Sequence, residues 1–207
     1  MYIPKYFKIT DANEISEFIE KNSFGTIVTT KQGKPIATHL PLGFRKVEED
    51  HYITGHMAYG NPQWRTFENA EDVLVMFQGS HAYVSSSWYE QENVPTWNYQ
   101  AIHIYGTASI LNEEELQQEL AKMLQKYEQH RENPVLMDNL SPNLLKTELK
   151  GIVGFKIKVR EIQAAYKLSQ NRKESDYLNI IKELQNEENP DSQQMAELMK
   201  KRLNKNI

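Results

Sequence analysis

The chain has 207 residues, a formal net charge of −4 and no cysteine. The acidic balance argues against a broadly basic surface for nucleic acids, and the lack of cysteine excludes disulfides, thiol nucleophiles and thiolate metal sites. The N-terminus lacks an apolar signal segment, and no apolar run approaches the ~18 residues of a membrane span. A cytoplasmic protein without a membrane segment is therefore expected.

The first quarter of the chain reads as one short helix followed by antiparallel strands. Asp11 and Glu14 form a capping-box pattern that opens the helix. Strands are expected at 26–30, 36–44 and 51–57. The first two should form a hairpin, because a short Gln-Gly-Lys turn separates them.

The middle of the chain carries the strongest strand signals. Asn61 before Pro62 is an N-cap followed by proline at the first helical position, so a short helix should start there. The run 72–79 contains an unbroken apolar stretch, which is typical of a strand buried on both faces. A separate strand is expected at 81–89 and a long one at 97–111.

The long strand has two faces of different character. One face is apolar and is expected to pack in the core; it holds Ile102, Ile104, Ala108 and Ile110. The other face mixes aromatic and polar side chains and suits an interface or a ligand wall; it holds Tyr99, His103, Tyr105 and Thr107.

The last part of the chain is predicted to be helical around one more strand. Asn112 and Glu115 form a second capping box that opens a helix of roughly eighteen residues with an apolar stripe. A short helix is expected at 141–151 and a strand at 152–159. Two terminal helices follow, separated at Asn189. About seven short strands interrupted by helices imply a small barrel or split sheet with helical attachments.

Most catalytic motifs are absent from the sequence. It has no G-x-S-x-G elbow, P-loop, Rossmann glycine fingerprint or H-E-x-x-H. No catalytic residue is therefore assigned, and no metal site is expected, because without cysteine it would need scattered histidines. His39, His56 and His103 leave three interpretations open: ordinary surface or interface histidines, a shared pocket, or an axial haem ligand.

The densest polar cluster is YKLSQNR, residues 166–172, with two cations and several amide or hydroxyl groups. Such a cluster suits an anionic ligand rich in hydrogen bonds. A solvated strand end leading into a helix is the open alternative. The basic run at 199–205 is interpreted as the solvated last turn of a helix.

Six runs of the chain together resemble the PaiB family, described as FMN-binding negative transcriptional regulators of bacteria. They occur in order over nearly the whole chain: HLPL (39–42), GHMAYGNPQW (55–64), GSHAYVSSSWY (79–89), VPTWNY (94–99), GIVGFKI (151–157) and KLSQNR (167–172). Ser80 and Ser86 stand where the family pattern has prolines. The segment before KLSQNR lacks the glycine and lysine often found there.

The resemblance implies a fold, a cofactor and a set of partners. The fold would be a mainly β, FMN-binding split β-barrel similar to pyridoxamine-phosphate oxidase, with peripheral and C-terminal helices. Residues 1–172 would form the split-barrel domain and 173–207 a helical extension packed on it. Such proteins are usually homodimers with flavin at the subunit interface. The residues expected to hold FMN are Thr38, His39, Thr54, Gly55, His56, Asn61, Gln63, Trp64, Tyr99, Lys167, Ser169, Gln170 and Arg172.

Two functions remain open at this stage. The first is a flavin-binding regulator that senses a redox or metabolic state and represses genes, directly on DNA or through a protein partner. The second is an FMN-dependent oxidoreductase acting on a small molecule. The acidic charge and the lack of a helix-turn-helix with a basic recognition helix favour indirect action on DNA. The sequence does not decide whether the protein is an enzyme.

Overall fold

The structure, a computed structural model, describes residues 1–70 and 72–205 and divides into two compact units. Unit 1 combines residues 1–18, 78–103 and 163–207, and unit 2 combines residues 19–77 and 104–162. Each unit is therefore built from segments that lie far apart in the sequence. The predicted division at residue 172 remains a prediction.

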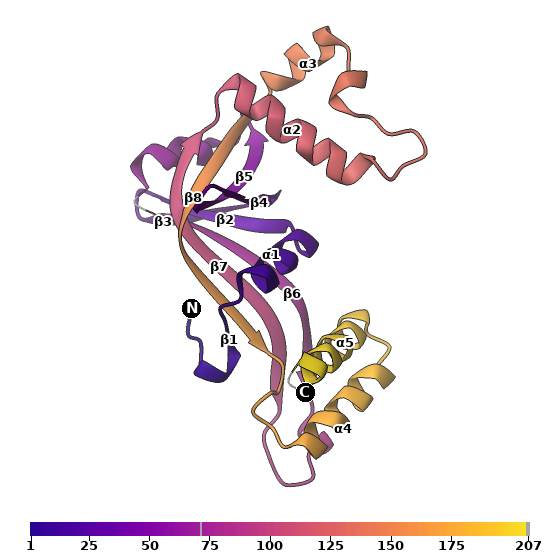
Figure 1. Cartoon of the computed structure of the whole chain (residues 1–207). Helices are drawn as coiled ribbons and strands as arrows, with labels where there is room; N and C mark the ends of the chain where they lie inside the picture. Colours follow the sequence, from indigo (N-terminus) through magenta and orange to yellow (C-terminus); the bar gives the residue numbers. More distant parts are fainter. Residues whose placement is uncertain (71, 206–207) are drawn as a thin grey trace. The chain divides into compact units, whose positions relative to one another are not determined.

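The strands form a mainly antiparallel sheet in the order β3-β2-β6-β7-β8-β5-β4, with β1 paired to β8 (Figure 1). Within the described residues no ladder joins β3 to β4, so the sheet is split and does not close into a full barrel. The strands are β1 Lys8–Ile9, β2 Phe24–Lys31, β3 Lys34–Pro41, β4 Gly43–Val47, β5 Asp50–Ala58, β6 Val73–Val84, β7 Thr96–Ile110 and β8 Ile152–Lys167.

Helices complete both units. The α-helices are α1 Ala12–Lys21, α2 Glu113–Glu128, α3 Pro142–Leu149, α4 Glu174–Asn186 and α5 Pro190–Lys205. The 3-10 helices are η1 Lys5–Phe7, η2 Pro62–Asn69, η3 Ser86–Trp88 and η4 Met137–Asn139. In the part of the chain that the structure describes, no helix has the length and apolar character needed to cross a membrane.

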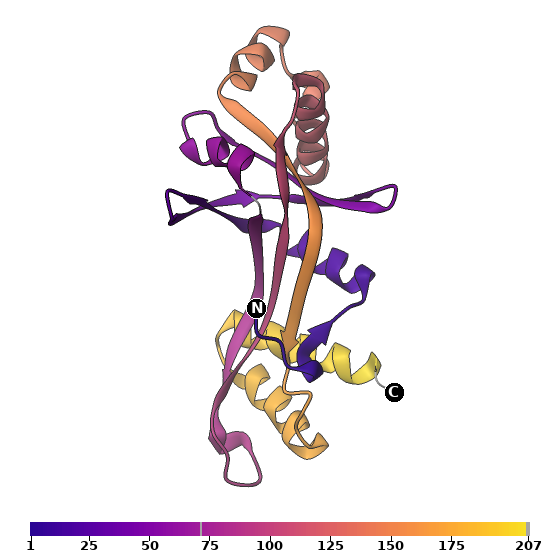
Figure 2. The ribbon, with the colours of Figure 1, turned by 90° about the vertical axis from the view of Figure 1, so that its left-hand side faces the viewer.

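Two hairpins shape unit 2. The β2–β3 turn places Gln32 and Gly33 at φ of 51° and 78°, the left-handed pair that a two-residue turn between twisted strands requires. Pro41 is the last residue of β3, which is an edge strand of the sheet. Proline has no backbone N–H to donate, and an edge strand tolerates this. The β4–β5 hairpin pairs Gly43 with Thr54. Figure 2 shows the two hairpins extending to opposite sides of the long strands.

The core of unit 2 lies between its strands and η2. The backbones of β7 and β8 come very close at Gly106, where a methyl group would lie 2.2 Å from the carbonyl oxygen of Lys158. Only glycine fits there without moving a strand. The fully buried apolar side chains of this unit include Ile27, Ile53, Val73, Val75, Phe77, Ile104, Phe155 and Ile157.

Unit 1 is stabilised by its two C-terminal helices and the strand ends. Helices α4 and α5 lie side by side (Figure 1), and the Tyr177 hydroxyl of α4 donates to the Met199 carbonyl of α5 at 2.9 Å. Each of these helices buries an apolar side, at Ile180 and Leu184 on α4 and at Met195 and Met199 on α5. The terminal helical pair is thus confirmed as two packed helices.

The sequence-based strand boundaries are wrong in one stretch. The two strands expected at 72–79 and 81–89 are one continuous strand, β6, followed by the 3-10 turn η3. Gly79 does not break the strand; it makes room for the Phe18 ring, which a methyl group there would meet at 2.7 Å. Leu74 is half-buried, so the strand alternates and is not buried on both faces.

Strand β8 also runs further than predicted, from Ile152 to Lys167. Tyr166 and Lys167 therefore belong to the strand, and the turn after it begins at Leu168. One position of β7 assigned to the core is not buried, because the Ile110 side chain is exposed. The fold class itself, mainly β with peripheral and C-terminal helices, is confirmed.

Candidate functional site

A pocket of about 440 Å³ lies in unit 2 between α2, the β4–β5 hairpin and the last turn of α1. Its volume falls within the range of roughly 300–1,000 Å³ usual for small-molecule sites. The strand wall is formed by Pro41 to Arg45 and by Thr54, Gly55 and His56. The helix wall is formed by one side of α2, from Leu116 to Tyr127.

Helix α2 is fixed at its N-terminus by the predicted capping box. The Asn112 side chain accepts from the Glu115 N–H at 2.9 Å, and the Glu115 carboxylate accepts from the Asn112 N–H at 3.0 Å. Glu115 also accepts from Lys156 of β8 at 2.5 Å, which holds the pKa of its carboxyl below the ordinary value. Leu116 packs directly on Gly154 of β8. A methyl group at Gly154 would lie 2.8 Å from Cδ1 of Leu116. The helix is therefore held close against β8.

The apolar stripe of α2 is less buried than the sequence predicted. Leu116 alone on this helix is buried in the described structure, whereas Met123 is half-buried and the Tyr127 side chain is 44% exposed. The Tyr127 hydroxyl is 2.8 Å from Ser23 Oγ. These partly exposed groups line the pocket, so part of the stripe faces a cavity instead of the core.

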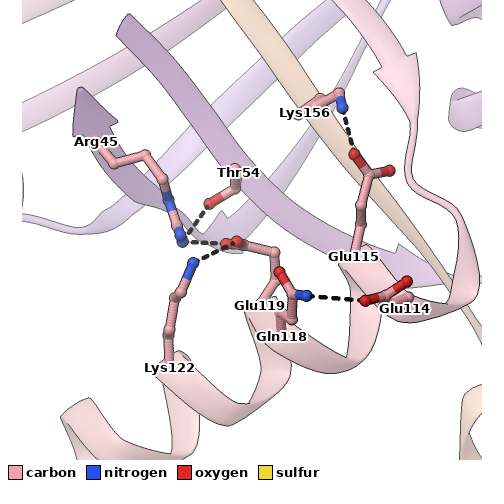
Figure 3. A network of polar contacts seen from close by, with 8 residues as sticks. All are labelled: Arg45, Thr54, Glu114, Glu115, Gln118, Glu119, Lys122 and Lys156. Atoms are coloured by element: carbon pink, nitrogen blue, oxygen red, sulfur yellow. Dashed lines mark hydrogen bonds and ion pairs between the residues drawn. The ribbon is translucent and has the colours of Figure 1, made fainter. Parts of the chain in front are cut away.

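A network of charges crosses the pocket wall (Figure 3). Glu119 of α2 forms an ion pair with Arg45 of β4 and accepts from Lys122 Nζ at 3.2 Å. Arg45 also donates to Thr54 Oγ1 of β5 at 3.3 Å. The Glu119 side chain is only 17% exposed. Two cations and one carboxylate thus meet in the lining of a cavity whose walls are both apolar and polar.

A further cation and an imidazole complete the polar lining. Lys126 of α2 donates to the Glu20 carbonyl oxygen at 3.1 Å. His56 is half-buried, and burial lowers the pKa of its imidazole from the ordinary value. It is therefore neutral at pH 7, with one ring nitrogen able to donate and the other to accept.

Gly55, between Thr54 and His56, is explained by packing. A methyl group at this position would lie 2.8 Å from Leu42 Cδ2 and 2.9 Å from the Phe155 ring. A larger residue would push one of these side chains away. Three predicted cofactor residues, Thr54, Gly55 and His56, thus sit together in the pocket wall.

A second group of predicted residues forms a hydrogen-bonded cluster at the start of η2. Asn61 accepts from the Gln63 N–H at 3.0 Å, as predicted for the N-cap, and its amide donates to Thr38 Oγ1. Thr38 in turn donates to Gln63 Oε1 at 2.5 Å. The buried Gln63 amide also donates to the carbonyls of Ile27 and Ile36. Both of its N–H donors are therefore used to hold η2 on β2 and β3.

His39 and Trp64 have partners of their own. His39 is exposed on β3 and stacks on Phe24, with ring centroids 6.4 Å apart. Trp64 donates to the Tyr59 carbonyl at 3.0 Å and is covered by the Arg65 guanidinium, 4.3 Å from its ring centroid. Arg65 supplies an exposed cation beside two aromatic rings.

The remaining predicted residues belong to unit 1, and two of them are held by internal hydrogen bonds. Ser169 is buried at φ 60°, and its hydroxyl donates to Asn98 Oδ1 at 3.0 Å. The Gln170 amide donates to the carbonyls of Tyr6 and Tyr166. These side chains close the turn after β8.

Lys167 and Arg172 are the two cations of the same turn. Lys167 donates to Thr96 Oγ1, and Arg172 lies 4.7 Å from the centroid of the Tyr89 ring. Burial, followed by the charge of Arg172, lowers the pKa of Lys167 from its ordinary value. In the described chain neither cation has a carboxylate partner. The Tyr89 hydroxyl is buried and has no hydrogen-bond partner among the described residues.

Tyr99, the last predicted residue, is half-buried on β7 in unit 1. The predicted residues therefore fall into three groups: the pocket wall and the η2 cluster in unit 2, and the turn after β8 in unit 1. The sequence reasoning missed the charged pocket residues Arg45, Glu119, Lys122 and Lys126. A usable signal was the spacing of Glu119, Lys122 and Lys126, three and four residues apart on one helix face.

The donor set of the pocket fits FMN. A phosphate needs cations or N–H donors, and Arg45, Lys122 and Lys126 supply cations. The flavin ring needs apolar contact and hydrogen-bonding groups at its edge, which Phe44, Met123, Thr54 and the neutral His56 provide. Across the described residues no group of three or more His, Cys, Asp or Glu side chains is placed to hold a metal ion.

Comparison with known proteins agrees with this chemistry. Residues 1–161 match a protein family described as "Putative FMN-binding domain". The chain is 72% identical to the "Protease synthase and sporulation protein PAI 2" of Bacillus subtilis (strain 168), and the match covers 100% of both chains.

Solved structures show the same fold at low identity. The flavocytochrome Anf3 from Azotobacter vinelandii superposes with a TM-score of 0.59 at 13% identity, over 86% of this chain and 78% of that one. The FAD- and haem-binding protein from Mycobacterium smegmatis gives 0.57 at 14% identity, over 77% and 73%. The expected cofactor is confirmed as that of the matched family, FMN, and the expected split-barrel fold is confirmed. The chain belongs to the PaiB family of FMN-binding-domain proteins.

Proposed function

We propose that this chain is an FMN-binding regulator of the PaiB type, which senses a redox or metabolic state and represses genes. The observation that carries the proposal is the unit 2 pocket, where cations, an apolar wall and a neutral imidazole surround a cavity of about 440 Å³. The name of the Bacillus subtilis relative refers to protease synthesis and sporulation, which supports a regulatory role. The cytoplasmic location predicted from the sequence is part of this proposal.

Each pocket residue has a task in this proposal. Arg45 and Lys122 hold the FMN phosphate. Thr54 orients the Arg45 guanidinium by accepting a hydrogen bond from it. His56 donates or accepts a hydrogen bond at the polar part of the flavin, and Met123 and Phe44 exclude water. When bound, FMN supplies one- and two-electron transfer chemistry. The η2 cluster and Trp64 shape the strands beside the pocket.

Lys167 and Arg172, with Ser169 and Gln170, are the alternative proposed anchor for the flavin phosphate, in place of Arg45 and Lys122. Within the described residues these two cations have no carboxylate partner, which supports the alternative. The internal hydrogen bonds of Ser169 and Gln170 favour a supporting role for these two residues. His39 and Tyr99 stay proposed contacts to the flavin because both have accessible ring surface.

A homodimer belongs to the same proposal. Contiguous exposed aromatic surface usually marks an interface, and Tyr83 and Trp97 are 45% and 53% exposed with ring centroids 5.9 Å apart. A two-fold dimer burying at least ~1,600 Å² would fall within the range of stable interfaces. Light scattering at micromolar concentration measures this, and a monomeric mass contradicts it.

The second candidate function is an FMN-dependent oxidoreductase acting on a small molecule. The His56 imidazole in the pocket favours it, since a general acid or base must lie within reach of the flavin. Against it, the Glu119 carboxylate is already held by two cations. We expect slow reduction by NADH or NADPH in stopped-flow experiments. Rapid, saturable reduction coupled to stoichiometric oxidation of a metabolite would establish the oxidoreductase instead.

Flavin titration of a blocked pocket tests where FMN binds. Met123→Trp fills the cavity from α2, whereas Gln118→Trp adds the same ring at an exposed position of the same helix. Fluorescence titration should show FMN affinity at least about tenfold weaker in Met123→Trp, because lost contacts of about 1.4 kcal/mol give that factor. Gln118→Trp should match the unchanged protein. Equal affinities for all three proteins would remove the pocket from the proposal.

A gel-shift series tests whether regulation acts directly on DNA. Direct binding through phosphate contacts weakens steeply with salt. The acidic net charge of −4 leads us to expect no specific shift with the protein alone. A salt-dependent shift would show that the protein binds DNA directly, without needing a protein partner to repress genes.

A further inference from the structure

The cations proposed to hold the FMN phosphate are not free in this structure. Glu119 forms an ion pair with Arg45 and accepts from Lys122 at 3.2 Å. Its neighbour one turn earlier, Glu115, is engaged differently, by Lys156 and by the Asn112 N–H of the capping box. Figure 3 shows the two carboxylates pointing to separate partners from the same helix.

Glu119 occupies the place that an anionic ligand would need. Its side chain is 17% exposed, Arg45 is 25% exposed, and all three charged residues line the pocket. A phosphate that enters must take Arg45 from this carboxylate or remain beside Lys126. Two like charges cannot share a partly buried guanidinium without a large penalty.

A phosphate dianion is the stronger competitor. It carries about −1.5 to −2 charges near pH 7 and three acceptor oxygens, against a single charge on the carboxylate. The planar guanidinium of Arg45 can bind it through two parallel hydrogen bonds. A neutral ligand gains nothing from displacing Glu119, and a monoanion merely replaces one charge by another.

We propose that Glu119 is a specificity-determining residue: an internal carboxylate that occupies Arg45 and Lys122 until the dianionic phosphate of a flavin mononucleotide displaces it. The inference rests on the proposed function, because it assumes that FMN binds in this pocket. Glu119 keeps the cations neutralised in the empty pocket. A ligand must also bind Arg45 more strongly than the Glu119 carboxylate does, which favours dianionic phosphates over neutral flavins and monoanions.

The variant Glu119→Gln removes the competing charge and keeps the size of the side chain. FMN affinity should rise by about tenfold, equivalent to about 1.4 kcal/mol, because the phosphate no longer has to displace a carboxylate. Riboflavin, which has the same ring system without the phosphate, should bind with unchanged affinity. Inorganic phosphate should raise the melting temperature of Glu119→Gln more than that of the unchanged protein.

Glu115→Gln is the matched control. It removes a carboxylate from the same helix one turn earlier, outside the pocket lining. Its stability should fall, because the capping box and the Lys156 contact weaken, while its ratio of FMN to riboflavin affinity stays unchanged. A similar rise in FMN affinity in both variants would reduce the effect to general charge and overturn the proposal.

Three outcomes separate the inference from the function on which it rests. If Met123→Trp weakens both flavins and Glu119→Gln strengthens FMN alone, the proposal holds. If Met123→Trp weakens both flavins but Glu119→Gln weakens FMN or shifts both flavins equally, Glu119 is a structural partner of Arg45 and the inference is wrong. If Met123→Trp affects neither flavin, FMN binds elsewhere, and the pocket proposal and the inference both fail.

Discussion

Two pairs of cations in this chain have opposite surroundings. In unit 2, Arg45 and Lys122 share the carboxylate of Glu119. In unit 1, Lys167 and Arg172 have a hydroxyl and an aromatic ring as partners and, within the described residues, no carboxylate. Burial, followed by the charge of Arg172, lowers the pKa of Lys167.

The difference shows that a dense run of cations in sequence is a weak guide to an anion site. Lys167 and Arg172 are five residues apart and drew attention at once. Arg45 and Lys122 lie on a strand and a distant helix, yet the fold brings them to one carboxylate beside a pocket. What surrounds a cation decides its role, and that information is three-dimensional.

The largest expected effect concerns Arg45. Arg45→Met should raise the Kd of FMN by about 10- to 150-fold, because a charge-assisted contact to phosphate contributes about 1.5–3 kcal/mol. Riboflavin affinity should change by less than about threefold, since the ring contacts of such a ligand remain. Fluorescence titration with both flavins measures the two values.

Arg131→Met is the control for this change. Arg131 follows α2, pairs with Glu128 at 3.0 Å and does not line the pocket. Its removal should leave both flavin affinities unchanged. If Arg45→Met weakens FMN and riboflavin equally, the arginine supports the pocket wall and the phosphate lies elsewhere.

Much of the fold was readable from the sequence because its signals are local. The Asn112 capping box, the Asn61-Pro62 helix start and the Gln32-Gly33 turn depend on neighbouring residues, and all three occur as predicted. Gly79 misled the prediction because a glycine inside a strand and a glycine that ends one look alike in sequence. The Phe18 ring that explains it lies sixty-one residues earlier in the chain.

The candidate site was predicted only where the resemblance supplied it. Thr54, Gly55 and His56 lie together in the pocket wall, while Gln63, which looked like a ligand, has both amide donors bound to backbone carbonyls. The spacing signal of Glu119 and Lys122 was not used, because a glutamate three residues before a lysine is common on helix surfaces. The role of Glu119 depends on Arg45, which is seventy-four residues away.

A smaller effect is expected in unit 1. The double change Lys167→Met, Arg172→Met should alter FMN affinity by less than about threefold if the unit 2 cations hold the phosphate. It should change the melting temperature by a few degrees, because Arg172 loses a cation–π contact of about 0.5–2 kcal/mol while the repulsion between the cations disappears.

Lys173→Met provides the matched control, since this exposed residue is next to Arg172 and its side chain makes no capping hydrogen bond. A loss of FMN affinity above tenfold in the double variant, with none in the control, would move the phosphate anchor to unit 1. It would also reverse the ranking of the two cation pairs.

The smallest effect compares one histidine from each unit. Burial lowers the pKa of His56, and burial followed by the N-terminal charge lowers that of His103. The unfolded chain therefore binds protons at a higher pH than the folded chain, near the ordinary value of about 6.5. The free energy of unfolding should fall as the pH drops below about 6.5, and should level off below the folded-state values.

Urea unfolding at pH 7.5, 6.5 and 5.5 measures this slope. His56→Gln and His103→Gln should each flatten it, and their effects should add because the two residues lie in different compact units. If FMN binds beside His56, saturating FMN should change the pH dependence of the free energy of unfolding in the unchanged protein and in His103→Gln. The change should be smaller in His56→Gln, which lacks the imidazole beside the flavin. An equal response in all variants would place the flavin away from His56.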